Sequence, residues 1–236
     1  MRALFVQHDH VSPTGPVSDR LRERGFQVDE ILVVEQQNFT TPNVAFEFPD
    51  VNGYDVIVPM GAPWGAWDDA CIGNWLLPEI AWIRAAIDRD IPVLGICFGG
   101  QLMARALGGT VTRAPKAEIG WTSLHTDDAS LVPSGPWFQF HYDRWTVPPG
   151  ATEIARNSAA SQAFTFGRSL ALQFHPELTA KTLQGWLDEG GQSEVVADGQ
   201  DPHLLLEHTR AEEPLAIART VCLVDAFIDR IALLGA

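Results

Sequence analysis

The chain has 236 residues, of which 46% are hydrophobic and 19% are charged. This length predicts one large domain or two small ones, and this composition excludes a disordered chain. The formal net charge of −14 at pH 7 argues against binding to nucleic acid or to an anionic membrane, because both require clustered positive charge.

Short apolar runs alternate with amphipathic segments through the first half of the chain. Continuous apolar runs predict buried strands, and apolar residues three or four apart predict helices. The 75–90 segment is the clearest helix, because its apolar residues fall on one face. This alternation is typical of an α/β fold with a mainly parallel sheet. The expected strands are 3–6, 26–34, 54–60 and 91–96, and the expected helices are 16–24, 75–90 and 100–107.

The pattern changes after Thr110. Short strands separated by proline and glycine are expected at 122–124, 137–140, 152–155 and 163–166, followed by a strand at 169–174. From Thr179 the chain is mostly helical, most clearly at 204–209 and 215–234, with a turn at 198–202. No repeat or linker is evident, so we predict one domain spanning 1–236, with about 180–236 as a helical C-terminal extension. The acidic segment 188–201 and these helices can cap a site or form an interface, and closure of the core by the terminal helix is the simpler expectation.

Cys97 follows the 91–96 strand and precedes the 100–107 helix, with Gly95 and Gly99 as its second neighbours. This pattern is typical of a nucleophile elbow, a sharp turn that lifts a side chain above the sheet. A helix N-terminus also favours the thiolate. The alternative is a buried structural cysteine, which we expect for Cys71 and Cys222. The three cysteines are far apart and form no Cys-x-x-Cys pair, which favours a reducing cytoplasm.

His175 ends the 169–174 strand, and Glu177 follows two residues later. Residues two apart in extended chain point the same way, so Glu177 can hold the imidazole of His175. A thiolate in acyl transfer needs such an acid to protonate the leaving nitrogen, and a carboxylate to orient it. Cys97, His175 and Glu177 therefore predict a catalytic triad.

Together these residues resemble the class I, triad-type glutamine amidotransferase family, from the third strand through Glu177. Within it the chain is similar to the glutaminase domains of GMP synthases and to stand-alone γ-glutamyl peptidases. The resemblance implies a flavodoxin-like three-layer α/β/α sandwich with small antiparallel strands. It also implies that Cys97 forms a glutamyl thioester, that His175 transfers the proton and that Glu177 orients His175.

The resemblance implies further site residues. The family's oxyanion loop corresponds to Gly61-Ala62-Pro63, which implies that the backbone amides of Ala62 and Phe98 form the oxyanion hole. Gln101 matches the glutamine of the family's GxCxGxQ motif and is expected to contact the glutamyl group, beside Gly61. His141-Tyr142-Asp143 is similar to the His-Gly-Asp of the GMP synthase branch, with Tyr142 in place of glycine. This implies Asp143 as the partner of the substrate's α-ammonium group.

The leading hypothesis is a thiol enzyme that hydrolyses the γ-amide of glutamine or of a γ-glutamyl compound. It acts either as a self-contained hydrolase or as a glutaminase subunit that passes ammonia to a synthase partner. A silent binding or regulatory protein on the same scaffold and a cysteine-dependent redox protein are the alternatives. The triad argues against the former, and the 61–63 loop with the His-Pro-Glu sequence argues against the latter.

The expected ligand is a small molecule, with neither a metal nor a cofactor. His8 and His10 form a His-x-His pattern without a cysteine or carboxylate partner in sequence, which is weak evidence for a metal. The chain has no P-loop, and too few residues follow Glu177 for a second large domain, so we do not expect a complete GMP synthase. No apolar run approaches the roughly 20 residues of a spanning helix, and none resembles a signal peptide. Association with copies of itself is left open.

Overall fold

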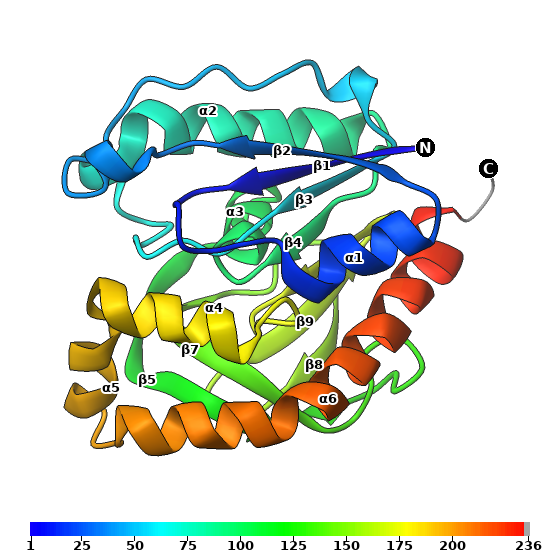
Figure 1. The fold of residues 1–236 in the computed structure, drawn as a ribbon. Helices are drawn as coiled ribbons and strands as arrows, with labels where there is room; N and C mark the ends of the chain where they lie inside the picture. The colour runs from blue at the N-terminus through cyan, green and yellow to red at the C-terminus, as the bar shows by residue number, and fades with distance from the viewer. Residues whose placement is uncertain (234–236) are drawn as a thin grey trace.

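The computed structural model describes residues 1–233 and has an α/β fold (Figure 1). Ten strands are present in this part of the chain: Arg2–Gln7 (β1), Gln27–Leu32 (β2), Val56–Pro59 (β3), Leu94–Ile96 (β4), Val111–Ser123 (β5), His125–Thr126 (β6), Pro136–Trp145 (β7), Thr152–Arg156 (β8), Ser161–Phe166 (β9) and Ser169–Leu172 (β10). One sheet has the order β2-β1-β3 and another the order β4-β10-β9-β8-β6. A parallel bridge between Ile57 and Val93 joins them.

Strands β2, β1, β3, β4 and β10 run in the same direction, and β9, β8 and β6 continue antiparallel. The predicted α/β fold with parallel strands is therefore confirmed. Parallel strands end at one edge of a sheet, so the segments that follow β1, β3, β4 and β10 meet there. Those segments contain His8, Gly61, Cys97 and His175.

Helices cover both faces of the parallel strands. They are Gly15–Glu23 (α1), Asp69–Asp88 (α2), Phe98–Ala106 (α3), Ala180–Trp186 (α4), Gln192–Ala197 (α5) and Pro202–Phe227 (α6), with short turns at Gln36–Asn38 (η1), Val51–Gly53 (η2), Leu187–Gly191 (η3) and Ile228–Ala232 (η4). Ala3 and Phe5 of β1 pack in the cluster that includes α1 and α6. Leu4 and Val6 pack in the cluster that includes α2 and α3. This alternation produces the predicted three-layer sandwich.

Helix α2 begins at Asp69, earlier than the predicted start at residue 75. The side chain of Asp68 caps it, with 3.1 Å between Asp68 Oδ1 and the backbone nitrogen of Cys71. An aspartate at this position satisfies one of the unpaired amides of the first turn. The apolar period alone therefore missed the first turn and a half of the helix.

The expectation of short strands after Thr110 is wrong for β5 and β7. These are long strands that pair antiparallel with each other in a separate two-stranded sheet. The register shifts between Arg113 and Glu118, which accommodates Pro115, and Gly120 has a φ of 99°. Proline and a left-handed glycine interrupt the sequence pattern of a strand, although the register shift accommodates the proline and glycine adopts a positive φ without a steric cost.

The C-terminal helices also differ from the expectation. A single helix, α6, covers the predicted 204–209 segment and the predicted 215–234 segment as far as Phe227, and Pro214 lies within it. The predicted turn at 198–202 precedes it, where the Asp201 side chain accepts a hydrogen bond from the amide of His203 at 2.8 Å. The end of the predicted 215–234 helix, Leu234, lies outside the described residues. Helix α6 runs beside α1 and its end packs into the core, so it closes the core as expected (Figure 1).

Candidate active site

Cys97 occupies a sharp turn between β4 and α3. Its φ is 49° and its ψ is −104°, in a region that residues with a side chain rarely adopt. Such strain costs about 1–3 kcal/mol and persists where surrounding packing enforces it, often at functional sites. The expected strand-to-helix turn is present, and Cys97 is the residue at its apex.

Two glycines let the backbone pass close to its neighbours at this turn. A Cβ atom on Gly99 would lie 2.0 Å from the carbonyl oxygen of Pro59, on β3. A Cβ atom on Gly95 would lie 2.6 Å from Met103 Sδ and 2.7 Å from the carbonyl oxygen of Gly99. Since real Cβ contacts do not reach these distances, only glycine fits at either position.

His175 and Glu177 follow strand β10 and form a buried pair. His175 Nδ1 lies 2.7 Å from Glu177 Oε1, and both side chains are almost fully buried. The backbone amide of His175 donates to the carbonyl of Phe138 on β7, at 2.9 Å. Within residues 1–233, Nε2 of His175 has no hydrogen-bond partner, so this nitrogen is available to a ligand or to the nearby sulfur.

The environment of His175 favours its protonated form. Burial lowers the pKa of its imidazole, but the charges of Glu177 and Cys97 oppose burial and raise that pKa well above the ordinary value. Gly61 also lies at this point, because a Cβ atom on it would be 3.2 Å from His175 Cε1 and 4.0 Å from Cys97 Cβ. The loops after β3, β4 and β10 therefore converge on one centre that has the groups for nucleophilic acyl transfer.

The two predicted oxyanion donors flank this centre. Ala62 follows Gly61, and Phe98 is the first residue of α3, whose amide has no acceptor within the helix. No backbone hydrogen bond between described residues uses the amide of Ala62. Both residues line the same pocket as Cys97 and His175.

The predicted substrate-binding residues Gln101, Tyr142 and Asp143 line this pocket too. Gln101 is buried, and its Nε2 lies 3.3 Å from Oε1 of Gln173, whose own Nε2 lies 3.7 Å from Cys97 Sγ. Asp143 is 6% exposed, and its Oδ1 has no hydrogen-bond partner in the part of the chain described. A buried carboxylate oxygen without a partner favours a cationic ligand.

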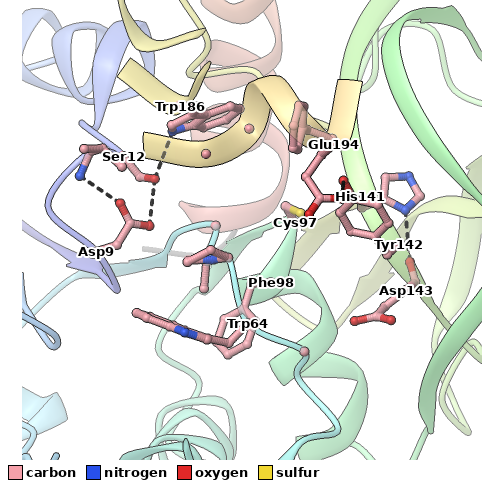
Figure 2. Close-up of a pocket in the computed structure, with 18 of the residues that line it drawn as sticks. Asp9, Ser12, Trp64, Cys97, Phe98, His141, Tyr142, Asp143, Trp186 and Glu194 are labelled. Carbon is pink, nitrogen blue, oxygen red and sulfur yellow. Dashed lines mark hydrogen bonds between the residues drawn. The ribbon is translucent and has the colours of Figure 1, made fainter. Parts of the chain in front are cut away.

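The pocket has a volume of about 410 Å³, and Cys97 lies between two of its walls (Figure 2). Tyr142 and Asp143 lie on one wall. Asp9, Ser12 and Trp186 lie on the other, where Ser12 Oγ is 2.9 Å from Asp9 Oδ2 and 3.2 Å from Trp186 Nε1. Burial raises the pKa of the Asp9 carboxyl, although hydrogen bonds from Val11 and Ser12 oppose this.

The sequence interpretation missed the residues that the C-terminal extension adds to the pocket. Helix α4, turn η3 and helix α5 contribute Trp186, Glu189, Gly190, Gly191, Ser193 and Glu194. The Trp186 ring meets the His175 ring edge-on, with 5.0 Å between their centroids. The acidic 188–201 segment thus caps the site, which was the less favoured of the alternatives. Asp9, which lies outside the extension, was missed as well, although it closely follows the predicted 3–6 strand.

The two other cysteines do not line this pocket, whereas His141 does. Cys71 is half-buried and Cys222 is exposed, so the expectation that Cys222 packs in the interior is wrong. His8 is fully buried and pairs with Glu79. Among residues 1–233, no three His, Cys, Asp or Glu side chains are grouped so that they could hold a metal ion. None of the helices within those residues has the length and apolar character needed to cross a membrane.

Residues 17–188 match the family model described as glutamine amidotransferase class-I. The chain is 32% identical over 152 residues to a glutamine-hydrolysing GMP synthase of Aeropyrum pernix, a match that covers 58% of this chain and 30% of that protein. It is 32% identical over 155 residues to the glutamine amidotransferase-like protein chyE of Penicillium rubens, covering 60% of this chain and 63% of that one. In both cases the match spans less than two thirds of the relative.

Solved structures have the same fold over nearly the whole chain. A glutamine amidotransferase from Thermotoga maritima superposes with a TM-score of 0.80 at 27% identity, covering 97% of this chain and 98% of that one. A glutamine amidotransferase from Methylobacillus flagellatus superposes with a TM-score of 0.81 at 24% identity, covering 96% and 94%. At that identity the second likeness shows the fold alone.

Proposed function

The chain belongs to the class-I glutamine amidotransferase family, and from that premise we propose that it hydrolyses the γ-amide of glutamine or of a larger γ-glutamyl compound through a thioester on Cys97. The observation that carries this proposal is the strained Cys97 beside the buried His175–Glu177 pair. A silent binding protein on the same fold would have no use for a strained nucleophile turn or for a buried acid–base pair.

The first half of the reaction forms the thioester. The Cys97 thiolate attacks the γ-carbonyl carbon, and the carbonyl electron pair moves onto the oxygen. The amides of Ala62 and Phe98 stabilise that oxyanion. Collapse of the intermediate breaks the carbon–nitrogen bond, and Nε2 of His175 gives its proton to the leaving nitrogen. Ammonia or an amine departs, and a glutamyl thioester remains.

The second half hydrolyses the thioester. Neutral His175 takes a proton from water, and the resulting hydroxide adds to the thioester carbonyl, again with a negative charge on the oxygen. Collapse of this intermediate breaks the carbon–sulfur bond. Glutamate leaves, and the thiolate of Cys97 and the imidazolium of His175 are restored. Glu177 keeps the ring of His175 in one orientation through both halves.

The pocket wall with Asp143 receives the glutamyl group in this proposal. The carboxylate of Asp143 has a buried oxygen without a partner within residues 1–233, and it would take the substrate's α-ammonium group. Gln101 and Gly61 border the γ-carbonyl, and Tyr142 borders the amino-acid end.

The size of the pocket supports a γ-glutamyl amide larger than glutamine as the substrate. Glutamine loses only ammonia, which would not fill the space between Cys97 and the wall of Asp9, Ser12 and Trp186. Volumes of about 300–1,000 Å³ are typical of sites that enclose a whole small molecule. A self-contained γ-glutamyl amide hydrolase is therefore the version that we favour.

A glutaminase subunit that delivers ammonia to a separate synthase is the second candidate. The observation that favours it is the match to the GMP synthase of Aeropyrum pernix, of which this chain spans 30%. We also propose a reducing, cytoplasmic setting, because Cys71, Cys97 and Cys222 are all free thiols.

A screen of the purified chain against glutamine and a panel of γ-glutamyl amides tests the proposal. The wild type should release ammonia or amine, Cys97→Ala should abolish this release, and the matched Cys71→Ala variant should retain it. A glutamine-like diazo-ketone should label Cys97 alone. Rapid turnover of a γ-glutamyl amide with slow turnover of glutamine would favour the hydrolase over the ammonia-delivering subunit. If no γ-glutamyl compound is hydrolysed with or without a synthase, the proposal is wrong.

A further inference from the structure

A buried histidine lies directly behind the oxyanion loop, and the mechanism above does not use it. We propose that His8, held by Glu79, is a positioning residue that sets the orientation of the peptide between Gly61 and Ala62. This inference rests on the proposed function, because it assigns His8 a role in forming the oxyanion hole.

The contacts of His8 join three elements. Its Nδ1 lies 3.0 Å from the carbonyl oxygen of Gly61, in the loop after β3. Its Nε2 lies 3.0 Å and 3.1 Å from the two carboxylate oxygens of Glu79 on α2. His8 and Glu79 are both 0% exposed, so water does not compete for these contacts.

The partners decide which nitrogens carry a proton. The Gly61 carbonyl can only accept, so Nδ1 of His8 must donate to it, and Nε2 donates to an ionised Glu79 carboxylate. Burial lowers the pKa of His8, but the Glu79 carboxylate and the Gly61 carbonyl outweigh burial and raise it. With Glu79 ionised, His8 donates one hydrogen bond to Glu79 and one to the backbone of Gly61.

The hydrogen bond from His8 to the Gly61 carbonyl also fixes the direction of the next amide. In a planar trans peptide the C=O and the following N–H point in opposite directions. Because His8 holds the Gly61 carbonyl on the interior side, the amide of Ala62 is directed away from His8. Gly61 itself lies against His175 and Cys97. A rotated peptide would instead present a carbonyl oxygen to the developing oxyanion, which would repel it.

The same ring supports the other donor. The His8 ring meets the Phe98 ring edge-on at 4.8 Å between centroids and stacks on the Trp75 ring at 5.5 Å. Phe98 supplies the second proposed oxyanion amide. One side chain thus contacts Phe98 and the carbonyl of the peptide whose amide nitrogen belongs to Ala62.

Fold stability does not account for this pair. Replacing a buried ion pair by apolar groups of similar volume is often neutral or stabilising, because two charges no longer have to be desolvated. What apolar groups cannot supply is a hydrogen bond to the Gly61 carbonyl. The role that remains for His8 is the orientation of that carbonyl.

The double variant His8→Phe/Glu79→Leu is therefore the sharpest test. It keeps an aromatic ring at residue 8, leaves no unpaired buried charge, and removes the bond to Gly61 together with the His8–Glu79 pair. Glu79→Gln is the conservative variant, because a glutamine amide can donate to Nε2 and leave a proton on Nδ1 for Gly61. Trp75→Phe is the packing control, since it alters the same cluster without touching that bond.

Two labelling rates read out the oxyanion hole without requiring turnover. A chloroketone analogue of glutamine is attacked by Cys97 at its carbonyl, which forms an oxyanion before chloride leaves. Iodoacetamide is attacked at the carbon that bears iodine, and no oxyanion forms. The ratio of the two rates therefore measures the hole separately from the reactivity of Cys97.

In the double variant we expect the labelling ratio and kcat to fall about 10- to 100-fold, less than the 10²- to 10³-fold typical of removing a donor outright. KM and the rate of labelling by iodoacetamide should not change. In Glu79→Gln and in Trp75→Phe, the labelling ratio and kcat should stay near the wild-type values. An unchanged ratio, or a ratio that falls equally in Trp75→Phe, would overturn the inference. If the chloroketone labels wild-type Cys97 but the protein hydrolyses no γ-glutamyl amide, the proposed function is wrong. The labelling ratio would still test the role of His8 in that case.

Discussion

Tyr142 on β7 donates a hydrogen bond to Glu194 on α5, with 3.0 Å between Tyr142 Oη and Glu194 Oε2. Burial and the Glu194 carboxylate raise the pKa of the Tyr142 hydroxyl, so the donor keeps its proton at neutral pH. The guanidinium of Arg113 lies over the face of the same ring, 4.8 Å from its centroid. Tyr142, which replaces a glycine of the GMP synthase pattern, thus fastens the C-terminal cap to the wall that holds Asp143.

Tyr142→Phe should loosen this cap while it keeps the ring. A hydrogen bond to a charged acceptor is worth about 1.5–3 kcal/mol, and exposure of Glu194 reduces this, so we expect KM for larger γ-glutamyl amides to rise about 5- to 10-fold. Amide hydrogen exchange in 187–197 should become faster. Tyr54→Phe is the matched control, because Tyr54 is the only other tyrosine and does not line the pocket. Equal KM values and equal exchange in the two variants would contradict the fastening role.

Asp143→Asn should weaken recognition of the α-ammonium group. Loss of a charge pair in a buried site costs about 2–3 kcal/mol, so we expect kcat/KM for glutamine to fall about 30- to 100-fold. The fall should appear mostly in KM. Glutaramic acid, which is glutamine without its α-amino group, is the control substrate. The variant and the wild type should process it at the same low rate, and a variant that loses both substrates equally would place Asp143 elsewhere in the mechanism.

Local sequence chemistry was enough to predict the centre of the site. Cys97 has glycines as second neighbours, and His175 and Glu177 are two residues apart on extended chain, so each pattern needs only neighbouring residues. The strand ends that carry them meet because the strands are parallel, which the alternating apolar runs already indicate. The helical layers followed from the same alternation.

The rest of the site depends on contacts between residues distant in sequence. Trp186 lies at the end of α4, and Glu194 lies beyond the bend at Gly190, whose φ of 110° interrupts the helix. His8 and Glu79 come from a strand end and a helix interior, and neither has a sequence pattern that predicts the other. Contacts between residues that are far apart in the sequence cannot be predicted from the spacing of apolar residues, because that spacing reports only on local structure.

Glu177→Gln should change the pH dependence of the reaction. The Glu177 carboxylate raises the pKa of His175, so its removal should lower that pKa and move the alkaline limb of kcat/KM to lower pH. Activity should also fall at least about tenfold, because the amide holds the ring less well. Glu213→Gln, at a carboxylate outside the pocket, is the control. An alkaline limb that stays in place would mean that another group sets it.

The His175–Glu177 pair should make the free energy of unfolding depend on pH. The pKa of His175 in the folded protein is raised above its ordinary value of 6.5. The stabilisation that protonated His175 gives to the folded state is therefore fully present below pH 6.5 and is lost as the pH rises through the folded-state pKa. In Glu177→Gln this alkaline loss should be smaller. Urea unfolding of the two proteins between pH 6 and pH 9 measures the difference, and parallel pH profiles would contradict it.

Gly99→Ala should disrupt the Cys97 turn. Its Cβ atom would lie 2.0 Å from the carbonyl of Pro59, so β3 and α3 would have to separate. We expect loss of activity and a destabilisation of more than about 3 kcal/mol, beyond the usual range for a single substitution. Gly185→Ala is the matched control, because a Cβ atom there would meet no heavy atom within 4 Å. A Gly99→Ala protein with wild-type stability would show that the turn has more room than the contacts indicate.

Phe227→Ala tests whether the C-terminal extension and the α/β sandwich form one domain, as the sequence predicts. Phe227 of α6 is fully buried in the cluster that contains Phe5, and Thr220 of the same helix donates to the Pro176 carbonyl at 2.7 Å, between the two triad residues. Truncation of a buried phenylalanine costs about 3–5 kcal/mol.

If α6 belongs to the domain, this cost should lower the single unfolding midpoint of the whole chain. Activity should also fall, because α6 holds the 175–177 loop through Thr220. Leu215→Ala, at a side chain that is 60% exposed on the same helix, should change neither. Two separate unfolding transitions, with only one moved by Phe227→Ala, would instead make the extension an independent unit.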